Sequence, residues 1–339
     1  MFKPSPGSRT AARNCAIYLS GGIGDGVLGM MFAQALAEQT GGKVSLLMTQ
    51  AEPALELFRA QPYVREVVSL QAVHQSRGWK RISDLQQVLK SKNYDALFLF
   101  SFRNHVALAA RLAGIPQRVG FVRYHQPHLA ALLTHRTWVR RKGTPHPDTY
   151  TWLPLVFAKA GYRFEPRYPA LFCKPSAKAK AEQLLGKMPR IVGFGLNGSQ
   201  PYKRYSSQGF AEVARLLHER DAGLSFLLIG GSDVAHIAQD IRALLPDTIT
   251  VLDATQQDAE ICDSQALIAR CTVFASNDSM GMHIAVAHGV PTIGLFGATP
   301  AMRYAPWLHV IEPVGDKHMD AIAPAVVADA VWDCLASCR

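Results

Sequence analysis

The stretch of sequence that decides the fold runs from Thr272 to Pro300 and reads TVFASNDSMGMHIAVAHGVPTIGLFGATP. Its apolar run at residues 273–275 predicts a buried strand, and a polar loop follows at residues 276–279. A helix of small residues is predicted at 282–288, and Gly289 and Pro291 then lead into a second strand at 293–296. We therefore expect a βαβ unit whose loop lies at the carboxyl end of a strand, where open α/β sheets bind ligands.

The loop of this unit has the features of a phosphate site. The N–H groups of Ser279, Met280 and Gly281 would begin the helix without acceptors, and with the positive end of the helix dipole they suit an anion. Asp278 would face sugar or ribose hydroxyls beside the phosphates, with His283 one turn further along. Two alternatives stay open: Asp278 or Ser279 only caps the helix, and His283 is a core histidine without a ligand.

The composition predicts a globular protein of two domains, since the chain has 339 residues, 48% of them hydrophobic and 18% charged. No apolar run reaches the length of a transmembrane helix. Residues 1–14 are basic and rich in Pro and Ser, which predicts a disordered lead-in rather than a signal peptide. The six cysteines contain no C-x-x-C pair, which favours reduced thiols and a cytosolic protein.

Positive charge is concentrated in the first half of the chain. Residues 1–170 carry 22 Lys and Arg against 9 Asp and Glu, whereas residues 171–339 carry 14 against 17. No acidic residue lies between Asp95 and Asp148, a span that includes Arg123, Arg136 and Arg140. Such a block attracts a polyanion: nucleic acid, an anionic membrane surface or an acidic lipid-linked sugar. The alternative is a solvated basic face without a partner.

Apolar runs alternate with helical patterns along the chain, which predicts parallel sheets covered by helices. In the first half we predict strands at 15–19, 44–48, 66–70, 96–100 and 118–121, helices at 30–38, 82–90, 106–113 and 149–160, and loops with one short helix at 123–146. After a Pro-rich segment the pattern restarts, with strands at 191–195, 224–229 and 250–252 and helices at 177–185, 209–218, 234–244 and 259–269. The predicted domains are therefore 15–172 and 173–316, two Rossmann-like doubly wound sheets facing a cleft. A C-terminal segment, 317–339, contains a helix at 321–335 that is predicted to pack back towards the N-terminal domain.

A glycine-rich loop follows the first strand. Gly24, Gly26 and Gly29 match the G-x-G-x-x-G dinucleotide fingerprint, but the acidic residue expected about 20 positions later is missing. A nicotinamide site is therefore disfavoured. Asp25 lies among these glycines at the carboxyl end of the strand, where a carboxylate can point into a cleft; the alternative is that it caps the helix.

A second polar loop follows the strand at 191–195. Ser199 and Lys203 lie four residues apart in it, and a hydroxyl donor with a compact ammonium suits a diphosphate whose charge rises as it leaves. The alternative is an ordinary surface loop. A further turn with Gly230, Gly231 and Asp233 is placed to approach a nucleotide base or ribose.

The chain resembles family 9 of the glycosyltransferases, the heptosyltransferases of lipopolysaccharide assembly. The family pattern is Asp, Ser or Thr, a Gly-containing pair, one residue and His, then Gly-x-Pro-x-x-x-x-(Phe/Tyr)-Gly-x-Thr. It appears here as Asp278, Ser279, Met280, Gly281, Met282, His283, Gly289, Pro291, Phe296, Gly297 and Thr299. The family usually has Gly directly after the Ser or Thr, whereas this chain has Met280 there.

Two other loops match the family in the same order. The family motif G-(D/E)-x-(V/L)-L after the first strand appears as Gly24, Asp25, Gly26, Val27 and Leu28, and its acid is taken to be the catalytic base. Lys203, Arg204 and Tyr205 match the family's phosphate-binding Lys, a basic residue and an aromatic residue, with Ser206 where Pro is common.

The resemblance implies the GT-B fold and inverting transfer of heptose from ADP-heptose to a sugar hydroxyl of the lipopolysaccharide inner core, without a metal. Asp25 would take the acceptor proton, and Lys203 with the amides at 279–281 would stabilise the departing ADP. It further implies a cytoplasmic enzyme at the inner face of the membrane, with an acidic lipid-linked oligosaccharide acceptor and no nucleic acid. Arg123, Arg136 and Arg140 are the acceptor-binding candidates.

Other functions stay open. A GT-B glycosyltransferase with another nucleotide-sugar donor or a nucleotide-sugar epimerase could use the same paired sheets, and a non-catalytic polyanion-binding module could use the same basic face. Residues 277–281 also nearly mimic the G-x-S-x-G elbow of serine hydrolases, but Asn277 occupies the first Gly position, which demands a very small residue. A hydrolase is therefore disfavoured.

Overall fold

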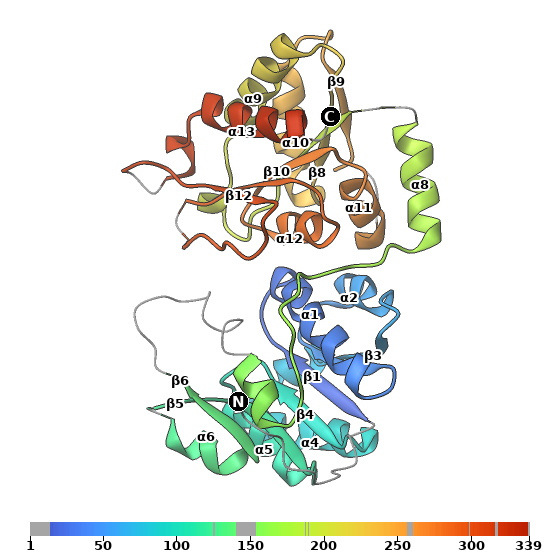
Figure 1. Cartoon of the computed structure of the whole chain (residues 1–339), viewed down its shortest axis with the longest axis vertical. Helices are drawn as coiled ribbons and strands as arrows, with labels where there is room; N and C mark the ends of the chain where they lie inside the picture. The colour runs from blue at the N-terminus through green and yellow to red at the C-terminus, as the bar shows by residue number, and fades with distance from the viewer. Residues whose placement is uncertain are drawn as a thin grey trace.

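The structure is a computed structural model that describes residues 14–124, 126–139, 154–186, 188, 190–255, 260–297, 299–315 and 318–337. These residues form two six-stranded parallel sheets, each flanked by helices, which Figure 1 shows one above the other. The predicted α/β class with two doubly wound sheets is confirmed. The predicted lead-in, apart from Asn14, and the first part of the helix predicted at 149–160 lie outside the described residues.

The first sheet has the strand order β3-β2-β1-β4-β5-β6. Its strands are β1 (Cys15–Leu19), β2 (Val44–Met48), β3 (Val64–Ser69), β4 (Ala96–Leu99), β5 (Gln117–Arg123) and β6 (His135–Val139). Its helices are α1 (Ile23–Gln39), α2 (Glu52–Arg59), α3 (Gln71–Gln75), α4 (Gly78–Lys92), α5 (Asn104–Leu112), α6 (Pro127–Leu132) and a helix at 154–159.

The second sheet repeats this arrangement, in the order β12-β11-β10-β7-β8-β9. Its strands are β7 (Ile191–Gly195), β8 (Ser225–Ile229), β9 (Thr250–Asp253), β10 (Val273–Asn277), β11 (Thr292–Leu295) and β12 (Leu308–Ile311). Its helices are α8 (Pro175–Leu185), α9 (Ser207–Arg220), α10 (Ala235–Leu244), α11 (Ile261–Ile268), α12 (Met280–Ala287) and α13 (Pro324–Ser337), with the 3-10 turns η1 (Pro201–Lys203), η2 (Ser232–Val234) and η3 (Met319–Ala321).

Both faces of the first sheet are covered, which explains why its strands are continuous apolar runs. Successive side chains of β1 enter different cores, since Ile17 packs with α1 whereas Tyr18 packs with α4 and α5. All strands are parallel, and the direction in which successive strands are added to the sheet reverses between β1 and β4 in the first sheet and between β7 and β10 in the second. These two switch points are where loops diverge and leave room for a ligand.

Two edge strands were missed by the sequence interpretation. β6 lies in the segment predicted as loops, because exposed Arg136 and Trp138 alternate there with buried Thr137 and Val139. An edge strand buries only part of its surface, so its apolar signal is weak. β12, an edge strand of the second sheet, has only four residues and was missed for the same reason.

The C-terminal helix corrects a further prediction. α13 packs against α9 and β10, and its Val327 and Val331 are buried in the core of the second domain. It does not return to the N-terminal domain as predicted. Its apolar face satisfies the pattern equally well on either domain, so the pattern did not identify its partner.

The two domains meet through α1 and α12, which Figure 1 shows at the junction of the two layers. Met30 of α1 and Ile284 of α12 belong to the same buried core. The link between the domains is also bonded to α12, since the Leu171 N–H donates to the Ala287 carbonyl at 3.3 Å. No helix in the described part of the chain has the length and apolar character needed to cross a bilayer.

Candidate active site

The loops after β7 and β10 meet at the switch point of the second sheet. The Lys203 ammonium lies 3.5 Å from Oδ2 of Asp278, and the Thr299 hydroxyl donates to the same oxygen at 2.8 Å. The side chains of Lys203 and Asp278 are 18% and 17% exposed. Asp278 therefore connects three loops and does not cap α12.

The start of α12 keeps its hydrogen-bond donors available. Its N-cap is Ser279, whose side chain makes no capping bond and whose Oγ is buried without a partner among the described residues. The N–H groups of Ser279, Met280 and Gly281 also lack an acceptor within the described residues. Met280 packs against the buried core that contains Met30 and Ile284, so its side chain is accommodated at the position where the family usually has Gly. Such a helix start suits phosphate oxygens.

His283 connects this site to the first domain. Its Nδ1 lies 2.7 Å from the Tyr304 hydroxyl, its ring stacks on that phenol, and it is only 6% exposed. Burial lowers the pKa of His283, while Asp278 and Asp25 act more weakly in the opposite direction. The imidazole is therefore neutral at pH 7, and carboxylates from both domains lie near it.

Asp25 lies in the first turn of α1, three residues after the N-cap Gly22. Its Oδ2 accepts a hydrogen bond from the Gly22 N–H at 2.9 Å, and Gln50 fixes the same turn by donating to the Gly21 carbonyl at 2.7 Å. Asp25 thus supports the helix start without being the N-cap. The bond also fixes the direction of its carboxylate at the switch point of the first sheet.

The glycines of the dinucleotide fingerprint serve packing. α1 begins at Ile23, so Gly24 lies inside the helix and not in a loop before it. A Cβ atom at Gly24 would come within 2.5 Å of the His283 ring, and one at Gly26 would come within 2.6 Å of the Phe58 ring. The absence of side chains here lets α1 approach α12 and α2 closely.

Gly24→Ala is expected to lower the free energy of unfolding by about 1 to 3 kcal/mol, because the new methyl group meets a buried ring that Tyr304 holds in place. Urea denaturation measures the change. Gly281→Ala is the matched control, since Gly281 is also the second residue of its helix but its Cβ would meet nothing closer than 3.5 Å. Equal stability of the two variants would contradict this close contact between the domains.

The other predicted residues divide into two groups. Arg123 ends β5 and stacks over Phe102 at 3.9 Å, on the carboxyl edge of the first sheet. Arg136 lies near the amino end of β6 and donates to the Ala130 carbonyl, so the structure does not bring it towards Asp25. Ser199 is exposed on its loop. Arg140 lies outside the described residues.

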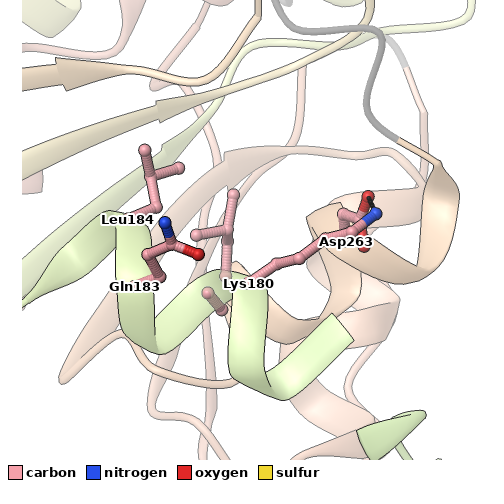
Figure 2. Close-up of a pocket in the computed structure, with 6 residues that line it drawn as sticks. Lys180, Gln183, Leu184 and Asp263 are labelled. Carbon is pink, nitrogen blue, oxygen red and sulfur yellow. Dashed lines mark hydrogen bonds and ion pairs between the residues drawn. The ribbon is translucent and has the colours of Figure 1, made fainter. Parts of the chain in front are cut away.

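Two cavities lie away from these loops. One, of about 360 Å³, is formed between α8 and α11, where Lys180 and Asp263 form an ion pair at 2.9 Å (Figure 2). The other, of about 340 Å³, lies beside Phe172 and His288. Neither contains a predicted site residue. Among the described residues, no group of three or more His, Cys, Asp and Glu could hold a metal ion.

The Lys203 and Asp278 loops lie within residues 82–323, which match the model of glycosyltransferase family 9, heptosyltransferase. The chain belongs to glycosyltransferase family 9. It is 25% identical over 234 residues to the lipopolysaccharide core heptosyltransferase OpsX of Haemophilus influenzae, a match that covers 68% of this chain and 65% of that protein. The matched region thus spans slightly less than two thirds of that relative.

Solved structures establish the fold of this family 9 chain. Escherichia coli ADP-heptose LPS heptosyltransferase II gives a TM-score of 0.74 at 19% identity, covering 96% of this chain and 99% of that one. A family 9 glycosyl transferase from Veillonella parvula gives 0.79 at 18% identity, covering 96% and 98%. The arrangement of the two sheets is therefore the GT-B fold.

Several site residues of the family 9 chain escaped the sequence interpretation. Thr299 was noted only as part of the family pattern, and Tyr304 was not noted. Arg103 was noted only as part of the basic block, and Arg81 was not noted. Burial lowers the pKa of His105 to about 4, with the nearby charges of Arg81 and Arg103 acting in the same direction, and Arg103 is the N-cap of α5. Because α5 follows β4, this positive charge lies at the same sheet edge as Asp25. The basic block between Asp95 and Asp148 was the available signal for Arg103, whereas Arg81 precedes that block.

Proposed function

We propose that this chain is an inverting, metal-independent glycosyltransferase that transfers heptose from ADP-heptose to an inner-core sugar of lipopolysaccharide. The observation that carries the proposal is the meeting of the Asp25 loop with the Lys203 and Asp278 loops around His283, at the switch points of the two sheets. The Lys203 and Asp278 loops lie within the family 9 match at residues 82–323, and the Asp25 loop precedes it in the chain. In this proposal the Asp25 carboxylate would act from the first domain, and the start of α12 with Lys203 would bind the diphosphate from the second.

The second domain would hold the donor. The diphosphate would accept hydrogen bonds from the N–H groups at the start of α12 and pair with the Lys203 ammonium, and the Ser279 hydroxyl supplies a further donor. Asp278 would face the sugar or ribose hydroxyls while bonded to Thr299. The nucleoside would extend towards Asp233, whose carboxylate accepts from Asn197 at 3.3 Å and Arg204 at 3.1 Å.

The first domain would supply the base. As the acceptor oxygen forms a bond to the anomeric carbon, the bond from that carbon to the diphosphate oxygen breaks, and ADP leaves with the electron pair. The acceptor hydroxyl proton passes to Asp25. Lys203 and the helix start stabilise the negative charge that develops on the leaving group. Attack from the face opposite to the diphosphate inverts the configuration.

The acceptor would bind along the basic edge of the first sheet. Arg123 is the last residue of β5, whereas Arg103 and Arg81 lie at the starts of α5 and α4. These cations suit the carboxylates and phosphates of an acidic lipid-linked oligosaccharide. Such an acceptor is membrane-bound, so we place the protein in the cytoplasm, in peripheral electrostatic contact with the inner membrane.

ADP is expected to stabilise the protein, because a ligand that binds only the folded state adds about 2.7 kcal/mol at 100 times its Kd. Thermal melting with and without ADP measures this, with NAD as the control nucleotide. Stabilisation by NAD but not by any nucleoside diphosphate would sink the transferase proposal. In an assay with ADP-heptose, release of ADP should depend on added acceptor, whereas conversion of the donor sugar without acceptor would indicate an epimerase.

A further inference from the structure

One amide side chain lies under the proposed donor site without a role in the mechanism above. Asn277 ends β10, the strand that lies between β11 and β7, and its side chain is completely buried, with 0% exposure. In the sequence interpretation Asn277 served only to disfavour a serine hydrolase. It directly precedes Asp278, a residue of the proposed donor site.

Asn277 holds both ends of the loop that carries Lys203. Its Nδ2 donates to the Leu196 carbonyl at 3.0 Å, and its Oδ1 accepts from the Tyr205 N–H at 2.9 Å. Leu196 is the first residue after β7, and Tyr205 comes two residues after Lys203. The amide therefore closes a ten-residue loop, and its buried hydrogen bonds replace those to water.

The far end of the loop is fixed a second time. The Tyr205 hydroxyl donates to the Ile322 carbonyl at 2.9 Å, and the Tyr205 ring is 2% exposed. At the other end, the Leu196 N–H donates to the Ile229 carbonyl at 2.9 Å. Lys203 thus extends from a loop with two anchored ends, and the amide that joins those ends belongs to the strand that leads into α12.

We propose that Asn277 is a positioning residue for the donor diphosphate: it sets the placement of the Lys203 ammonium relative to Asp278 and the start of α12. The inference rests on the proposed function. An amide is suited to this position because it presents an NH2 donor group and a carbonyl acceptor from the same short side chain. A carboxylate would place a second acceptor against the Leu196 carbonyl, and an aliphatic side chain would leave both loop ends unpaired.

A double-mutant cycle with Lys203 tests the proposal, with the Kd for ADP measured by calorimetry and donor kcat/KM measured by transfer. In the wild-type background, Asn277→Ala is expected to raise the Kd for ADP and to lower donor kcat/KM, each by about tenfold or more. In the Lys203→Ala background each change should be less than about threefold, because the two residues act as one unit. The KM for the acceptor should change by less than about twofold, since acceptor groups lie on the first domain.

Thr292→Ala is the matched control, because Thr292 is also completely buried in the second sheet and donates a hydrogen bond, to the Val290 carbonyl. It should lower the melting temperature without changing the Kd for ADP. If Asn277→Ala does not fold, Asn277→Ser replaces it in the double-mutant cycle. The serine hydroxyl is too short to bond both loop ends.

Two failures are distinguishable. Equal losses from Asn277→Ala in the wild-type and Lys203→Ala backgrounds would overturn the positioning role while leaving the donor site intact. An unchanged Kd for ADP in Lys203→Ala itself would instead overturn the donor site of the proposed function.

Discussion

Asp25→Asn is expected to slow heptosyl transfer by about 100-fold or more while leaving folding and donor binding nearly unchanged. General-base catalysis typically contributes about 10²- to 10⁴-fold, and an amide cannot accept the acceptor proton. The Asn side chain keeps the size of Asp and an oxygen that can accept from the Gly22 N–H, so the bond at the start of α1 is retained. Single-turnover transfer measures the loss of rate, and the melting temperature and the Kd for ADP show whether folding and donor binding are retained.

Asp263→Asn is the matched control for Asp25→Asn. Asp263 also lies in the first turn of a helix, α11, but it pairs with Lys180 beside the cavity between α8 and α11. Its loss should leave transfer unchanged. An Asp25→Asn variant that transfers heptose at the wild-type rate would falsify the assignment of the base. One that is destabilised by on the order of 1 kcal/mol, as expected for the loss of a capping bond, would show that the carboxylate supports the start of α1.

Lys203→Ala is expected to lower donor kcat/KM by about 30- to 150-fold, equivalent to about 2 to 3 kcal/mol. The ammonium lies 3.5 Å from the Asp278 carboxylate, a separation longer than a strong charge-assisted bond. This weak pairing is the one that Lys203 makes within the described part of the chain, so its donors can turn towards the diphosphate. Steady-state kinetics with varied ADP-heptose at saturating acceptor measure the loss.

The loss from Lys203→Ala should appear in kcat as well as in KM, because charge on the leaving diphosphate is greatest in the transition state. Lys180→Ala removes a cation of the same domain that is already paired with Asp263 at 2.9 Å, so its kinetics should match the wild type. A folded Lys203→Ala protein with unchanged kinetics would show that the Lys203 loop does not bind the donor phosphates.

The sequence by itself determined the layout of the two domains. The strands predicted at 15–19, 44–48 and 191–195 have the same bounds in the structure, as β1, β2 and β7. They lie inside sheets covered on both faces, so they appear in the sequence as continuous apolar runs that end at polar or glycine-containing loops. Asp25 and Asp278 were singled out because each lies near the carboxyl end of such a strand, where open sheets bind ligands, and Lys203 because its loop also matches the family pattern.

Only the tertiary structure decided which of these loops meet and what holds them. Periodicity reports that a residue is buried but not which partner buries it, so α13 was assigned to the wrong domain and the edge strand β6 was missed. Asn277 shows the same limit, because its hydrogen-bond partners lie 72 and 81 residues away in the chain. Strand order brings β7 beside β10 and α1 against α12, and it is set by packing between elements rather than by any local pattern.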